Sequence, residues 1–156
     1  MKICDFSKSN IQFPVAIVVS RFNEMITKAL CDGAITRLKE FGFHDDQITV
    51  VWVPGAVEIP LITKKLAQTK KYEAIITLGA VIQGDTRHFD YVCKQVSDGC
   101  AAIALNYDIP VIFGVLTTDN LEQAQERIGG KHGHKGKEAA ETAVEMVSLL
   151  REITHP

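Results

Sequence analysis

The stretch Val15-Ala16-Ile17-Val18-Val19 is an apolar and mostly β-branched run with no polar alternation. A strand that is apolar at every position is typical of a parallel sheet whose two faces are both covered. We therefore predict that residues 15–19 form a central strand, with helices packed above and below it.

Further short apolar runs alternate with longer helical patterns along the rest of the chain. Strands are predicted at 48–53, 74–78 and 111–116, and the intervening segments repeat apolar residues at helical spacing. This order predicts an α/β fold, a flavodoxin-like three-layer αβα sandwich with a central, mostly parallel four-stranded sheet. No linker, repeat or charge block divides the chain, so residues 1–156 are expected to form a single domain.

The composition excludes several classes of protein. With 46% hydrophobic and 23% charged residues, the 156-residue chain is neither disordered nor fibrous. Seventeen Lys and Arg against 19 Asp and Glu give a net charge of −2, so no basic excess exists to neutralise a phosphate backbone. We expect no nucleic-acid partner.

The N-terminal residues lack the apolar core of a signal peptide, and no apolar run approaches the roughly 18 residues of a membrane span. The four cysteines form no CxxC pair. These features favour a cytoplasmic, reduced protein with no membrane partner, no disulfide framework and no zinc-thiolate site.

Ligands of open parallel sheets bind outside the carboxyl ends of the strands. In this chain those ends lead into segments 20–23, 54–58, 79–88 and 113–118, which concentrate polar, aromatic and glycine residues. The opposite connections, 41–46 and 69–73, resemble plain solvated turns. The site is therefore expected on one rim of the sheet.

His88 is the only histidine on that rim, and its ordinary pKa of about 6.5 suits general acid–base catalysis. The alternative is a histidine at a helix start that Asp85 or Asp90 holds. Asp85 and Thr86 precede the same helix, where free N–H groups and a hydroxyl could bind an anion. Ordinary N-capping by either residue is the alternative.

Each of three further side chains could have either a role in ligand binding or a purely structural role. Phe22 could stack on a planar heterocycle or fold back onto the core. Glu58 could bind ligand hydroxyls or only complement the dipole at a helix start. Arg127, expected in the last turn of a short helix, could bind phosphate or only complement the helix dipole.

The basic, glycine-rich segment 129–137 is not a Walker A loop, because its glycine spacing fails and no strand precedes it. Metal binding by His132 and His134 is disfavoured, since no Cys or acidic residue is adjacent. A loop near an anionic ligand or a subunit contact remains. No G-x-G-x-x-G motif supports a dinucleotide cofactor.

Taken together, these motifs resemble the lumazine synthase family over nearly the whole chain. The resemblance is carried by several long stretches in the right order: 20–23, 53–56 through 58–60, 84–86 with 88–92, 113–118, and 122–124 with 126–127.

The resemblance implies condensation of 5-amino-6-(D-ribitylamino)uracil with 3,4-dihydroxy-2-butanone 4-phosphate. The products are 6,7-dimethyl-8-ribityllumazine, phosphate and water, the penultimate step of riboflavin biosynthesis, with no cofactor and no metal. His88 would shuttle protons. The other implied roles are ring stacking by Phe22, ribityl and ring-edge binding by Ala56, Val57 and Glu58, heterocycle contact by Ala80, Val81 and Ile82, and phosphate binding by Asp85 and Thr86 opposite Arg127.

The resemblance also implies a homo-oligomer, either a pentamer or an assembly of pentamers such as a decamer or an icosahedral shell. Phe113, Arg127 and Lys135 would reach the site from a neighbouring subunit. An N-terminal strand around Met1–Phe6 would add to a neighbour's sheet. Two departures from the family pattern stand out: Gln83, where many relatives carry arginine, and the segment 130–134.

Three other functions are alternatives to lumazine synthesis. An archaeal-type riboflavin synthase would act on the lumazine and need no butanone phosphate. A non-catalytic lumazine- or flavin-binding shell protein would bind without turnover, but it would have no use for a phosphate clamp. An unrelated flavodoxin-like domain would not carry so many family motifs in order.

Overall fold

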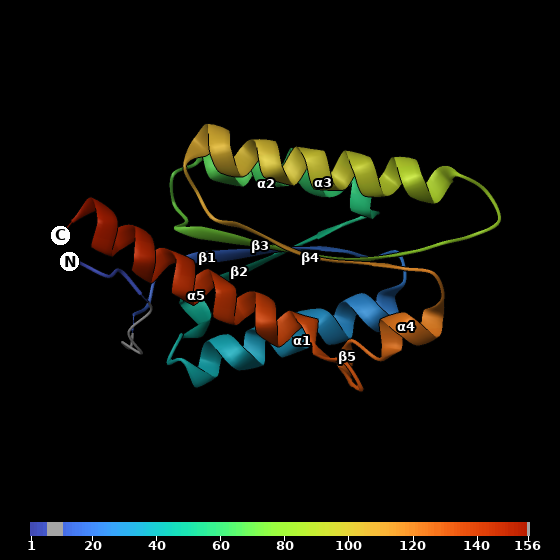
Figure 1. The fold of residues 1–156 in the computed structure, drawn as a ribbon, viewed down its shortest axis with the longest axis horizontal. Coiled ribbons are helices and arrows are strands. Elements are labelled where there is room, and N and C mark those ends of the chain that lie inside the picture. Colours follow the sequence, from blue (N-terminus) through green and yellow to red (C-terminus); the bar gives the residue numbers. More distant parts are fainter. Residues whose placement is uncertain (6–10, 156) are drawn as a thin grey trace.

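The protein was analysed as a computed structural model, which describes residues 1–5 and 11–155. Four parallel strands form the central sheet in the order β2-β1-β3-β4 (Figure 1). Their bounds are β1 Val15–Ser20, β2 Ile48–Val53, β3 Ala74–Ile82 and β4 Val111–Thr118. The predicted parallel four-stranded α/β sandwich is confirmed.

Helices cover both faces of the sheet, as Figure 1 shows. On one face lie α1 (Glu24–Glu40), α4 (Leu121–Gln125) and α5 (Lys135–Thr154), and on the other α2 (Ile59–Gln68) and α3 (His88–Tyr107). Two 3-10 turns, η1 (Asp45–Gln47) and η2 (Ala56–Glu58), flank β2. A short hairpin of β5 (Ile128–Gly130) and β6 (Gly133–His134) joins α4 to α5.

Strand β1 is buried along its whole length, as its apolar run predicts. Val15, Ile17 and Val19 pack into the core beneath α1 and α5. Ala16 and Val18 point the other way, into the core beneath α2 and α3. The alternation of side chains along one strand thus supplies both cores.

Strands β3 and β4 run further than the predicted 74–78 and 111–116. Gly79 does not end β3, because residues 79–82 pair in parallel with residues 115–118 of β4. A Cβ at Gly79 would lie 3.0 Å from the hydroxyl oxygen of Ser20 and 3.4 Å from Ile59. The glycine therefore serves close packing inside the sandwich, and the strand continues through it.

The ends of some segments also differ from prediction. Helix α4 ends at Gln125, so Arg127 lies beyond it and not in its last turn. Residues 1–5 have no regular structure in the single chain, and Phe6 of the expected N-terminal strand lies outside the described residues. None of the helices in the described part of the chain is long and apolar enough to cross a membrane.

Candidate active site

A hollow of about 380 Å³ opens where β1, β2 and β3 end, on the face covered by α2 and α3. Its size is ordinary for a small-molecule site. It is lined by the end of β3, the start of α3 and the segments that follow β1, β2 and β3: Phe22, Gly55, Ala56, Val57, Ala80, Val81, Ile82, Gly84, Thr86, His88, Phe89 and Val92. We call it the ring pocket.

Phe22 is held at the pocket by the backbone around it. The Arg21 N–H donates to the Val53 carbonyl at 2.8 Å and the Phe22 N–H to the Pro54 carbonyl at 3.1 Å. Asn23, in the left-handed conformation at φ 63°, donates its side-chain amide to the Ala80 carbonyl at 2.8 Å. Asparagine tolerates this conformation better than most residues.

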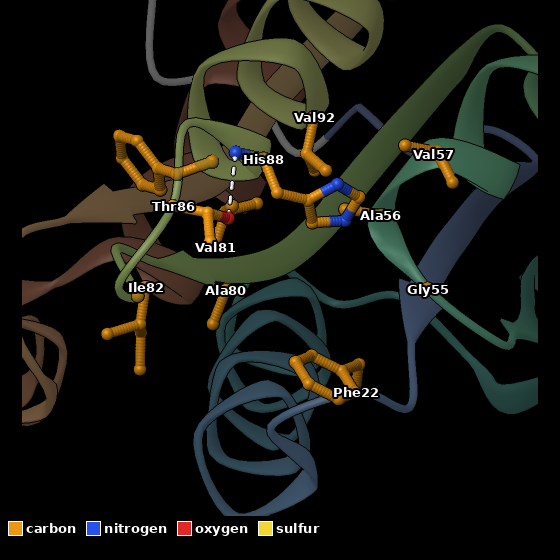
Figure 2. A pocket seen from close by; sticks show the side chains of 12 residues that line it. Phe22, Gly55, Ala56, Val57, Ala80, Val81, Ile82, Thr86, His88 and Val92 are labelled. Carbon is orange, nitrogen blue, oxygen red and sulfur yellow. Dashed lines mark hydrogen bonds between the residues drawn. The ribbon is translucent and has the colours of Figure 1, made fainter.

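With its backbone fixed in this way, the Phe22 side chain is 71% exposed and faces the pocket (Figure 2). The alternative in which the ring folds back onto the core is therefore wrong.

The loop after β2 lines the pocket with Gly55, Ala56 and Val57, whereas Glu58 is not among the lining residues. Glu58 Oε2 accepts the Gly55 N–H at 2.8 Å, so this side chain satisfies a free backbone group at the start of η2. Glu58 is the last residue of η2 and the N-cap of α2. It therefore lies just before the helix, whereas the sequence predicts it in the first helical turn. One carboxylate oxygen thus stabilises the loop that shapes the pocket wall.

His88 begins α3, and Figure 2 shows its imidazole projecting into the pocket near Ala56. Thr86 lies beside it, and its hydroxyl oxygen accepts the His88 N–H at 3.3 Å. The N-cap of α3 is Arg87, so the predicted N-capping by Asp85 or Thr86 is wrong, although the Thr86 hydroxyl accepts one N–H at the helix start. Among the described residues, neither Asp85 nor Asp90 forms an ion pair with the His88 ring.

Two pocket residues, Phe89 and Val92, have no assigned role in the sequence-based site. Val92 lies one helical turn after His88, so both side chains fall on the same side of α3. From this spacing the sequence could have predicted that Val92 lines the same pocket as His88.

A second hollow, of about 430 Å³, lies along β4 and the start of α5. It brings together three more of the predicted residues, Phe113, Arg127 and Lys135, with His132 and Glu138. We call it the cationic hollow. Phe113 reaches it because β4 is an edge strand on which Phe113 and Thr117 are exposed.

Arg127 makes the contact typical of a residue after a helix end. Its Nη1 donates to the Gln123 carbonyl of α4 at 2.7 Å, which agrees with the helix-dipole reading. The Glu126 carboxylate lies 3.9 Å from the same nitrogen and 3.6 Å from Nε2 of His132. No group of three or more potential metal ligands occurs in residues 1–5 and 11–155.

All but two of the predicted site residues thus line one of two hollows that share no lining residue, and Glu58 and Asp85 line neither. The ring pocket has apolar walls and contains His88. The cationic hollow contains the basic side chains Arg127 and Lys135, and edge strand β4 forms one of its walls. Asp85 lies exposed in the turn before α3, next to pocket residues Gly84 and Thr86.

Comparison with known proteins covers both sets. The family model described as 6,7-dimethyl-8-ribityllumazine synthase matches residues 12–151, which include every predicted site residue. The 6,7-dimethyl-8-ribityllumazine synthases of two Coxiella burnetii strains, CbuG_Q212 and RSA 493 / Nine Mile phase I, are each 55% identical over 141 residues. The alignment covers 90% of this chain and 93% of each relative. With ring pocket and cationic hollow both inside the matched range, the chain belongs to the 6,7-dimethyl-8-ribityllumazine synthase family.

Proposed function

We propose that the ring pocket and the cationic hollow are two halves of one active site, at which 5-amino-6-(D-ribitylamino)uracil condenses with 3,4-dihydroxy-2-butanone 4-phosphate. As a member of its family the chain has lumazine synthase activity, a transferase reaction of riboflavin biosynthesis. The observation that best supports the site is the convergence of Phe22, His88 and the apolar loop residues on one hollow. The proposal takes residues 1–156 as a single domain, because both cores share one sheet.

The apolar walls of the pocket suit a planar heterocycle. Phe22 stacks on the pyrimidine ring, and Ala80, Val81 and Ile82 lie along it. Ala56, Val57 and the free oxygen of Glu58 hold the ribityl chain and the ring edge. Glu58 keeps this role although one of its oxygens is bound to Gly55, since a carboxylate has a second acceptor.

The reaction needs proton transfers and an anion site. The uracil amine attacks the ketone, phosphate then leaves, and ring closure completes the lumazine with loss of water. His88 moves the protons, since an imidazole exchanges them readily near neutral pH. Asp85 and Thr86 bind the phosphate opposite Arg127. Holding both substrates together supplies much of the rate, with effective molarities of roughly 10⁵ M or more.

Because one chain keeps the two halves apart, the complete site forms where two copies meet. Phe113, Arg127 and Lys135 of one copy then face the ring pocket of its neighbour. The exposed edges β2 and β4 leave unpaired strand positions, and the N-terminal segment around Met1–Phe6 is proposed to add to a neighbour's sheet. The assembly is a pentamer or is built from pentamers.

The first test mixes the purified protein with both substrates and follows the fluorescence of 6,7-dimethyl-8-ribityllumazine. We expect product formation well above the uncatalysed condensation. No acceleration by folded, assembled protein would contradict the proposal. Conversion of added lumazine to riboflavin would then indicate a riboflavin synthase, and tight binding without turnover would indicate a flavin-binding protein.

Replacing His88 should slow turnover without abolishing it. General acid–base catalysis by one residue is worth about 10²–10⁴-fold, and substrate positioning remains in His88→Ala. Steady-state kcat measures the effect, with His155→Ala as a control at the opposite end of the sandwich. Complete loss of activity in a folded and normally assembled His88→Ala protein would contradict this role.

Replacing Arg127 should chiefly weaken binding of the phosphate substrate. A hydrogen bond to a charged group contributes about 1.5–3 kcal/mol, so KM for the butanone phosphate should rise on the order of 10- to 100-fold in Arg127→Ala. Arg151→Ala is the matched control, because its guanidinium pairs with Glu73 beyond the other end of the strands. An unchanged KM in Arg127→Ala would exclude the phosphate clamp.

Mixing the two variants tests whether the site is shared. In assemblies refolded from equal amounts of His88→Ala and Arg127→Ala chains, random pairing makes about a quarter of the sites from two intact halves. With the butanone phosphate held well below its native KM, activity should therefore recover to about a quarter of the native value, above either variant alone. No recovery in mixed assemblies would place the whole site within one chain.

A further inference from the structure

The hairpin between α4 and α5 ties the basic residues of the cationic hollow to one another. The Lys135 N–H donates to the Arg127 carbonyl at 2.8 Å, and the next cross-strand pair is Ile128 with His134. His134 therefore lies directly before Lys135 in the chain and beside Arg127 across the hairpin. Whatever holds His134 also holds the backbone of both basic residues.

The His134 ring is seated in a notch on α1. A Cβ at Gly33 of α1 would overlap the imidazole, so the ring occupies the space that the missing side chain leaves. On the β5 side, a Cβ at Gly129 would lie 3.6 Å from Cδ2 of the ring. A Cβ at Gly136 would overlap the Leu30 carbonyl, so α5 and α1 are already in close contact here.

The same ring caps α5. Nδ1 of His134 accepts the Lys137 N–H at 3.3 Å, at the N-terminus of a 20-residue helix. Capping side chains stabilise a helix by satisfying one of its free N–H groups, and Ser, Thr, Asp and Asn are the usual ones. Histidine can take this role only while Nδ1 carries no proton.

The surroundings favour that unprotonated form. Burial lowers the pKa of His134 below its usual 6.5, and the Lys137 ammonium lowers it further, whereas Glu138 acts in the opposite direction. On α1 and β5 the ring faces Gly33 and Gly129, which carry no ionisable group. The neutral ring thus stabilises the fold fully above pH 6.5, and this contribution is lost as pH falls through the lowered pKa.

We propose that His134 is a positioning residue: its neutral imidazole caps α5 and fixes the hairpin against Gly33, which holds Arg127 and Lys135 in place, and its protonation releases them. This rests on the proposed role of Arg127 and Lys135 in binding the phosphate substrate. Binding of that substrate therefore weakens in acid for a reason separate from His88. The imidazole itself does not touch substrate.

The test compares two substitutions in the assembled enzyme between pH 5.5 and 8. His134→Ala removes both cap and ring. A cap worth about 0.5–2 kcal/mol predicts a rise in KM for the butanone phosphate of roughly two- to thirtyfold, with kcat little changed. His134→Asn keeps a capping oxygen that does not titrate. His134→Asn should have a KM near the native value at pH 7.5. As the pH falls, its KM should rise less than that of the native enzyme.

The ratio of native KM to His134→Asn KM isolates this effect, because the two proteins differ at no other residue. A ratio that stays constant across the pH range would overturn the proposal. So would an unchanged KM in both variants accompanied by lower thermal stability, since that is the result of a purely structural role.

Gly33→Ala tests the notch by a different route. The added methyl group displaces the ring, so this variant should reproduce the raised KM of His134→Ala. In the double variant the methyl group enters the space that the ring has left, so the two effects should sum to less than their separate values. Simple additivity would overturn the notch, and the His134 variants decide the proposal if Gly33→Ala does not fold.

Amide hydrogen exchange at Lys137 separates failure of this inference from failure of the proposed function. If Arg127→Ala leaves KM unchanged, the phosphate role fails, and His134→Ala should still speed exchange at Lys137. If Arg127→Ala raises KM while His134→Ala changes neither KM nor exchange, the positioning role alone is overturned.

Discussion

Strands β1 and β3 are buried between two helical layers, and their backbones are paired on both edges. A ligand can reach these strands only at their carboxyl ends, so groups that bind or react come from the last residues of the strands and from the loops that follow them. The loops after β1, β2 and β3 meet at that end, and the start of α3 follows directly. The position of Phe22, Ala56 and His88 around one hollow is a consequence of this burial.

The sequence predicts this part of the structure well, because continuous apolar runs and strand-end loops are local patterns. It places Phe22, Ala80 and Thr86 on one rim, and the structure brings them to one pocket. It fails at Gly79, because the predicted strand 74–78 stops before this glycine and β3 continues through it to Ile82. The neighbouring Ser20 and the pairing with β4 decide that question, and neither is visible in the local sequence.

The sequence does not show which backbone group a polar side chain bonds to. Glu58 bonds to Gly55, and Arg127 bonds to the last turn of α4, because each finds a free backbone group within reach once the chain has folded. The division of the site has the same origin. Phe113 lies on the outer edge strand, and the sheet order that puts β4 there depends on long-range pairing.

The separation of the ring pocket from the cationic hollow has a thermodynamic consequence. If each complete site spans two copies, a substrate that touches both halves binds only where copies are joined. Bound substrate then strengthens subunit association by the same free energy with which association strengthens substrate binding. At a ligand concentration of 100 times Kd this linkage amounts to about 2.7 kcal/mol per site. Bound substrates thus stabilise the contacts between subunits. The enzyme should therefore dissociate least on dilution while it is turning over.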